Sequence, residues 1–156
     1  MTLALRHSGG QDLDAETLYA LLRLRVEVFV VEQTCPYPEL DGRDLRPTAR
    51  HFWLEDAGAQ VISTLRLVQE EESDDPVFRI GRVCTRASDR GRGHTTTLMG
   101  AALAEVGDRP CRLSAQSYLA DMYARHGFAV DGPEFVEDGI AHVPMLRLAP
   151  AGGTRR

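Results

Sequence analysis

The spacing of apolar residues along the chain predicts a mixture of helices and strands. In the first fifth of the chain, leucines and Phe29 recur every three or four positions, as on one face of a helix, and Asp14 is suited to its N-cap. The same spacing from Leu98 onward predicts a second helix, with Gly107 as its C-terminal cap. A short helix is expected at residues 119–126, and strands at residues 2–6, 51–54, 61–68, 78–85, 111–116, 128–130 and 140–148. Ser8, Gly9 and Gly10 are expected to break the first strand.

The stretch from residue 78 to residue 106 organises this pattern, because a strand leads through a turn with two glycines directly into a helix. Such a turn directs unpaired backbone N–H groups, and the positive end of the helix dipole, at one point where an anion is stabilised. Arg90 and Arg92 add positive charge beside that point. The pattern therefore indicates a phosphate or pyrophosphate cradle, the alternative being a solvated turn. Thr96 replaces the third glycine of a dinucleotide fingerprint, and no Gly-Lys-Ser/Thr ending marks a P-loop.

Composition narrows the class of protein. A chain of 156 residues with 43% hydrophobic residues predicts one domain, at residues 1–149, followed by a disordered tail at 150–156. The net charge of −5 argues against a general nucleic-acid binder, and the acidic run at residues 70–75 is expected to be a solvated hairpin loop. Three cysteines, an odd number, are expected to be reduced, and no leader or membrane-spanning stretch is apparent. We therefore expect a cytoplasmic protein.

The loop that follows the first helix carries both signs of charge. Two prolines end that helix, and a loop then runs to Arg50. Its charged residues would ordinarily be surface charges, although loops often carry binding residues. They include Asp41, Arg43, Asp44 and Arg46.

Three segments resemble motifs of a known protein family, and they occur along the chain in the order that the family has. They are Arg90-Gly91-Arg92-Gly93-His94-Thr95 before a helix, the segment 122–128 with Tyr123 and Gly127-Phe128, and the run 18–33 with Cys35-Pro36-Tyr37 and residues 41–44. The first two resemble the acetyl-CoA motif and the Phe-Tyr-x-x-x-Gly-Phe signature of the GNAT superfamily of N-acetyltransferases, and the third resembles the N-terminus of its ElaA-type subgroup. Thr95 departs from the Gly/Ala of the motif, and its β-branch would crowd an approaching phosphate oxygen.

The resemblance implies an α/β fold of the α+β type, a mixed, mostly antiparallel central sheet flanked by helices, in which two splayed strands hold the cofactor. It implies acetyl-CoA as cosubstrate, with the pyrophosphate held by residues 90–95, and no metal. Backbone groups of Val83 and Thr85, on either side of Cys84, would pair with the pantetheine arm as an added strand does. Gln116 would reach the pantetheine.

For catalysis, the resemblance assigns Tyr123 as the general acid that protonates the leaving thiolate. Glu32, which follows an apolar helical run, is our first choice of general base, because a partly desolvated carboxylate has a raised pKa; an ordered water is the alternative. Acetylation of Cys84 as a first step ranks below direct transfer. The acceptor site is expected to contain Glu32, Gln33, His51 and His142.

The expected function is transfer of an acetyl group from acetyl-CoA to a primary amine, by direct transfer in a ternary complex. The alternatives are a non-catalytic acyl-CoA-binding or sensor protein, which would not need Tyr123, and a nucleic-acid module, which the acidic balance disfavours. The acceptor stays open among polyamines, amino acids, aminoglycoside-like compounds and peptide amines, because the loop charges nearly cancel. A homodimer is left open, and no membrane or nucleic-acid partner is expected.

Overall fold

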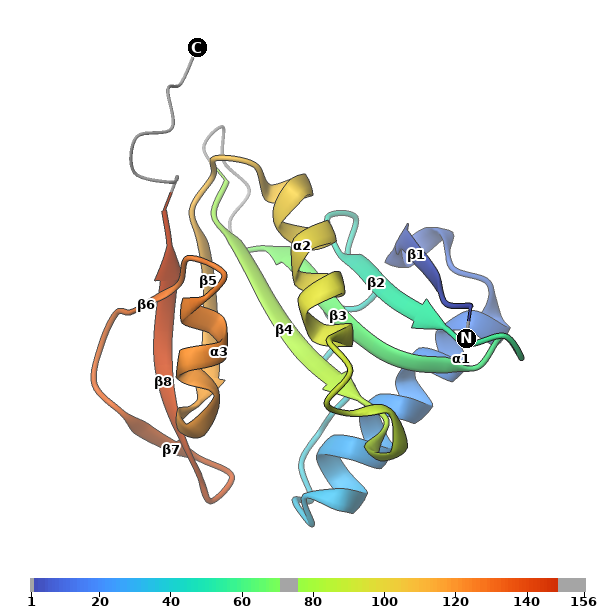
Figure 1. Cartoon of the computed structure of the whole chain (residues 1–156), viewed down its shortest axis with the longest axis horizontal. Coiled ribbons are helices and arrows are strands. Elements are labelled where there is room, and N and C mark those ends of the chain that lie inside the picture. Colours follow the sequence, from blue (N-terminus) through green and yellow to red (C-terminus); the bar gives the residue numbers. More distant parts are fainter. Residues whose placement is uncertain (1, 71–75, 149–156) are drawn as a thin grey trace.

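The strands form one sheet, which is the centre of the computed structural model (Figure 1). The structure describes residues 2–70 and 76–148, and within them the sheet has eight strands in the order β1-β2-β3-β4-β5-β8-β6, with β7 also paired to β8. All neighbours are antiparallel except β4 and β5, which are parallel. The expected mixed, mostly antiparallel sheet is thus confirmed. The strands are β1 Ala4–Gly9, β2 Arg50–Glu55, β3 Val61–Gln69, β4 Phe78–Thr85, β5 Cys111–Gln116, β6 Ala129–Val130, β7 Phe135–Glu137 and β8 Ile140–Arg147.

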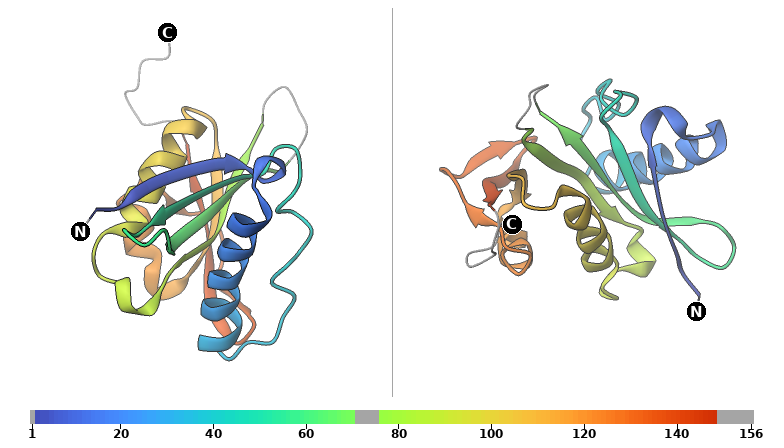
Figure 2. Two further views of the ribbon diagram at one scale, coloured as in Figure 1. Left: turned by 90° about the vertical axis from the view of Figure 1, so that its right-hand side faces the viewer. Right: turned by 90° about the horizontal axis from the view of Figure 1, so that it is seen from above.

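Helices cover both faces of the sheet (Figure 2). Helix α1 (Ala15–Arg25) packs against β3 and β4 on one face, while α2 (His94–Val106) packs on the other face against β2, β3 and β4, and α3 (Ala120–Ala124) packs against β5 and β6. Asp14 caps α1 as expected, since its Oδ1 accepts a hydrogen bond from the Thr17 N–H at 2.7 Å. In the two described ranges, no helix has the length and apolar character needed to cross a membrane.

Helix α1 continues into a π-helical segment, Val26–Glu32, which the apolar run alone did not indicate. The backbone N–H of Gln33 bonds to the carbonyl oxygen of Val28 at 3.2 Å, five residues earlier, and that of Cys35 bonds to Val30 at 3.1 Å. Such wider turns are rare and occur mainly at functional sites. Here the segment leads directly into the loop at residues 33–49, which crosses the α1 face of the sheet to reach β2.

The two faces of the sheet are held differently. The α2 face contains the main apolar core, which includes Leu98, Met99 and Leu65, each 1% exposed or less. The α1 face has only a small apolar cluster, formed by Leu24, Val28 and Cys84. Polar contacts must therefore hold much of the loop against this face.

Some expected boundaries are wrong. The first strand does not break at Ser8, because β1 stays paired with β2 as far as Gly9 opposite Arg50. The break falls at Gly10, where a Cβ atom would lie 1.8 Å from the Asp44 carbonyl oxygen. The closing hairpin has an additional strand, β7, and its turn at Asp138 and Gly139 is as expected. The acidic run, apart from its first residue, and the C-terminal tail lie outside the described residues.

Candidate active site

Strands β4 and β5 separate, as expected of the strands that contain Val83 and Cys111. They pair only through Phe78 with Cys111 and Arg79 with Arg112, and they diverge beyond that point (Figure 1). The pairing of β4 with β3 shifts register between Thr64 and Arg66, opposite a bulge at which Arg82 has a φ of 52°. A bulge bends its strand. Within the described residues, no strand pairs with the β5-facing side of β4 beyond Arg79.

A cavity of about 1100 Å³ occupies the opening between the two strands. From the α2 face it is lined by the turn before α2 and by α3, including Gly93 and Tyr123. From the α1 face it is lined by the π-helical segment and the following loop, including Glu32 and Tyr37. The opening therefore connects the two faces of the sheet.

The turn before α2 has the geometry of an anion cradle. Gly91 and Gly93 have φ values of 76° and 80°, which side chains with a Cβ rarely adopt. Gly93 is the N-cap of α2 and no side chain caps the helix, so its first N–H groups are available to a ligand. The cavity is lined by Arg90, Gly91, Gly93, His94 and Thr95. Arg92 is not in the cavity wall; its Nη1 faces Asp89 at 3.8 Å.

Arg90 links this turn to the end of the π-helical segment. Its Nη1 and Nη2 donate to the two carboxylate oxygens of Glu32 at 2.6 and 2.9 Å, and its Nε donates to the Thr85 carbonyl oxygen at 2.9 Å. The hydrogen bond from Arg90 lowers the pKa of Glu32. The raised pKa that we expected for this carboxylate is therefore wrong, and with it the physical reason for choosing Glu32 as the base.

Tyr123 lies in the cavity wall on α3. The residue is 6% exposed, and its ring packs edge-on against Phe128, with centroids 6.4 Å apart. Burial raises the pKa of Tyr123 to about 12, so the hydroxyl keeps its proton across the neutral range. The site thus offers a hydroxyl donor inside the opening.

Cys84 lines the cavity but is a poor nucleophile. Burial raises its pKa to about 12, because the charged thiolate is disfavoured away from water. Arg90 acts in the opposite direction and does not compensate. The geometry gives no support to an acetyl-cysteine intermediate.

His142 and Gln116 face each other across β5 and β8, and both line the cavity, as does Gln33. The His142 Nδ1 lies 2.7 Å from the Ile140 carbonyl oxygen. A carbonyl oxygen can only accept, so Nδ1 must carry the proton and Nε2 of the neutral ring has a free lone pair. The ring also stacks on Phe135, at a centroid distance of 5.6 Å.

His51 does not belong to this site, contrary to our expectation. It is 1% exposed, it does not line the cavity, and its Nε2 lies 3.0 Å from the Asp44 carbonyl oxygen. Burial lowers the pKa of His51. His51 therefore stabilises the position of the loop against β2 and does not contact the cavity.

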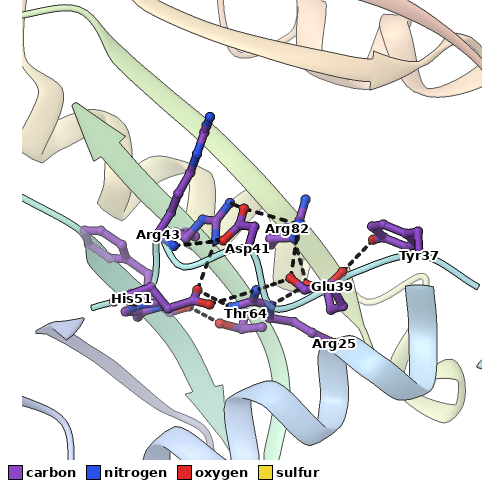
Figure 3. Close-up of polar contacts among 11 residues, drawn as sticks. Arg25, Tyr37, Glu39, Asp41, Arg43, His51, Thr64 and Arg82 are labelled. Atoms are coloured by element: carbon purple, nitrogen blue, oxygen red, sulfur yellow. Dashed lines mark hydrogen bonds and ion pairs between the residues drawn. The ribbon is translucent and has the colours of Figure 1, made fainter. Parts of the chain in front are cut away.

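The contacts that hold this loop were missed by the sequence analysis, which treated its acids as surface charges (Figure 3). Three carboxylates of the loop are ion-paired with three arginines from α1 and the sheet, at N–O distances of 2.5–3.3 Å. The sequence contained part of the signal for buried ion pairs, because Arg25 interrupts the apolar stripe of α1 and Arg66 interrupts the apolar run of β3. We call this set the ion-pair network: Arg25 with Glu39 and Asp44, Arg66 with Asp41 and Asp44, and Arg82 with Glu39 and Asp41.

Comparisons with known proteins identify the family. The acetyltransferase (GNAT) domain family matches residues 19–148. A UPF0039 protein of Mycobacterium tuberculosis is 63% identical over 94% of this chain and 94% of its own length. The protein ElaA of Escherichia coli is 38% identical over 92% of this chain and 93% of its own length. A crystal structure described as an acyl-CoA N-acyltransferase from Pseudomonas aeruginosa superposes with a TM-score of 0.87, at 39% identity, and covers 94% of this chain and 99% of that one.

The two relatives and the solved structure each match over more than nine tenths of both chains, and the superposition agrees with the mixed, mostly antiparallel sheet described above. The resemblance noted from the sequence is confirmed. The chain therefore belongs to the GNAT family of acyltransferases, within the group of the UPF0039 and ElaA proteins.

Proposed function

We propose that the protein transfers an acetyl group from acetyl-CoA to a primary amine, directly, within a ternary complex. The observation that carries the proposal is the cavity that joins an uncapped helix N-terminus beside Arg90 to a buried, protonated Tyr123. The first feature suits a pyrophosphate and the second suits a leaving thiolate. A non-catalytic sensor would require only the first.

The donor groups around the opening fit a CoA ester. The N–H groups at the start of α2 and the Arg90 guanidinium would hold the pyrophosphate. The β5-facing side of β4, at Val83 and Thr85, would add the pantetheine amides in the manner of an extra strand. Gln116 on β5 offers an amide from the opposite wall, and the buried Cys84 also lines the cavity. Thr95, at the start of α2, also lines the cavity, and its methyl group would limit how closely a phosphate oxygen approaches.

The thioester supplies an activated carbonyl carbon, and Tyr123 stabilises the sulfur that leaves. As the amine nitrogen bonds to the carbonyl carbon and the C–S bond breaks, the Tyr123 hydroxyl would donate a hydrogen bond to the sulfur and protonate it, and the phenolate would then regain a proton from water. The high pKa of Tyr123 ensures that the donor is present at neutral pH.

His142 is the best-placed group to accept the proton of the amine. Its Nδ1–H is held by the Ile140 carbonyl, so the Nε2 lone pair remains for a proton, either directly or through a water molecule. Glu32 is less suited to this role, because the hydrogen bonds from Arg90 stabilise its charged form and lower its pKa. One such group raises the rate by about 10²–10⁴, or about 3–5.5 kcal/mol, whereas positioning the two reactants contributes about 7–11 kcal/mol. Binding geometry therefore contributes more than any single base.

The test is a calorimetric titration with acetyl-CoA, followed by measurement of CoA thiol release across a panel of amines. Binding with amine-dependent release supports the proposal. Binding without release from any amine would favour the sensor, and the lack of binding would contradict both.

A further inference from the structure

The charges that the loop at residues 33–49 presents to the cavity differ from the charges in its sequence. In the sequence, the acids and arginines of this loop nearly cancel. In the structure, its three acids, Glu39, Asp41 and Asp44, are neutralised by Arg25, Arg66 and Arg82 in the ion-pair network. These carboxylates are therefore not available to attract a cationic acceptor.

The loop arginines that remain are Arg43 and Arg46. Both are exposed and both line the cavity on the α1 face. Among the described residues, neither guanidinium has a carboxylate within ion-pair distance, and the hydrogen bonds of Arg43 involve its backbone, whose N–H donates to Asp41 and whose carbonyl oxygen accepts from the Arg46 N–H. Figure 3 shows the Arg43 side chain pointing away from the network. Two positively charged residues thus line the cavity without an ion-pair partner in the described parts of the chain.

Negatively charged residues lie beside the start of the loop, at the opposite end from these two arginines. Glu137 and Asp138, at the β7–β8 turn, also line the cavity, and the Asp138 carbonyl oxygen lies 3.3 Å from the Cys35 Sγ near the start of the loop. His142, the proposed proton acceptor, is on the same β7–β8 hairpin. We call the part of the cavity that is lined by this loop and the β7–β8 hairpin the acceptor side. It has an acidic end beside His142 and a basic end at Arg43 and Arg46.

We infer that the acceptor is a small amine that also carries an anionic group, a carboxylate or a phosphate, with the amine at the hairpin and the anion at Arg43 and Arg46. Arginine binds both anions through paired N–H donors, which fixes orientation as well as charge. A polyamine would place positive charge against the two arginines. This inference rests on the proposed acetyl transfer.

The test compares amines that differ only in the anionic group. We would measure thiol release from acetyl-CoA with phenylalanine against phenethylamine, 4-aminobutanoate against butylamine, and phosphoethanolamine against ethanolamine, with spermidine as a cationic amine. The carboxylate and phosphate pairs distinguish the two anions. The wild type should favour the anionic member of at least one pair by about tenfold or more in kcat/KM.

Variants then locate the effect. The double variant Arg43→Gln/Arg46→Gln should lose this preference through a higher KM, with the affinity for acetyl-CoA unchanged. The control, Arg6→Gln/Arg23→Gln, removes the same charge from two exposed positions outside the cavity wall and should keep the preference.

Three results would overturn the inference while leaving acetyl transfer intact: equal rates within every pair, a preference for spermidine or for the partner that lacks the anionic group, or a change in acetyl-CoA affinity in the double variant instead of in the acceptor KM. If no amine released thiol, the proposed function itself would fail and the inference with it.

Discussion

The contact between Glu32 and Arg90 allows a test in which the two partners have opposite effects. In the structure, Glu32 occupies both Nη atoms of Arg90 beside the cradle, and the Arg90 Nε is held separately by the Thr85 carbonyl oxygen. Glu32→Gln should therefore free the guanidinium for a phosphate without letting the side chain move away from the turn. We expect acetyl-CoA to bind more tightly in this variant.

The magnitude follows from the exposure of the pair. Both side chains are 42% exposed, so the ion pair is screened and contributes about 0.2–1 kcal/mol. Its removal should tighten binding by about 1.5-fold to fivefold. Arg90→Gln should weaken binding by about tenfold, because it removes a charge-assisted hydrogen bond to the phosphate. The gain in Glu32→Gln should shrink as salt is added.

Isothermal titration with acetyl-CoA measures the affinities, and thiol release measures kcat in the same samples. Glu27→Gln is the matched control, because Glu27 pairs with Arg23 on the solvent side of the helix and does not line the cavity. Weaker binding in Glu32→Gln would refute the competition between Glu32 and phosphate. A fall in kcat of about 10²-fold or more, with unchanged affinity, would restore Glu32 as the general base.

Three further predictions test the remaining assignments. Tyr123→Phe should lower kcat by about 10²-fold or more and leave acetyl-CoA affinity nearly unchanged, and an unaltered kcat would remove Tyr123 as the proton donor. His142→Gln should lower kcat/KM by about 10²-fold near neutral pH and recover as the amine loses its own proton at higher pH; a pH profile parallel to that of the wild type would exclude His142 as the base. Because burial lowers the pKa of His51 from 6.5, the unfolded chain binds a proton more readily, so the free energy of unfolding should fall between about pH 7 and about pH 5. His51→Gln, which can still donate to the Asp44 carbonyl, should flatten that slope in urea titrations, and an unchanged slope would contradict the assignment.

The elements that the sequence predicted well are those with a local cause. The cap at Asp14, the strand–turn–helix of residues 78–106 and the turn at Asp138 each depend on neighbouring residues, and the structure has all three. The cradle could be predicted for the same reason, since its glycines and its helix are adjacent in sequence.

The parts that the sequence did not predict depend on distant residues. His51 is a reasonable acceptor-site residue from its strand alone, yet the loop that covers it arrives from another part of the chain. The pKa of Glu32 is set by Arg90, 58 residues away, so its own helix gives no indication of the shift. The pairing of the loop acids likewise depends on arginines from three separate elements.

Arg82 contributes both to the bend of β4 and to the ion-pair network. Its φ of 52° is a left-handed conformation that costs a residue with a Cβ about 1–2 kcal/mol, and it lies at the bulge of β4, beyond the last pair with β5 at Arg79. Its side chain faces Glu39 Oε2 at 2.7 Å, an ion pair without hydrogen-bond alignment, and it donates to Asp41 Oδ2 at 3.3 Å. The same residue therefore lies at the bend of β4 beside the cavity and forms ion pairs with two of the three loop acids. The bend of β4 and the pairing of the loop acids are consequently linked through one residue, so a substitution of Arg82 should alter both.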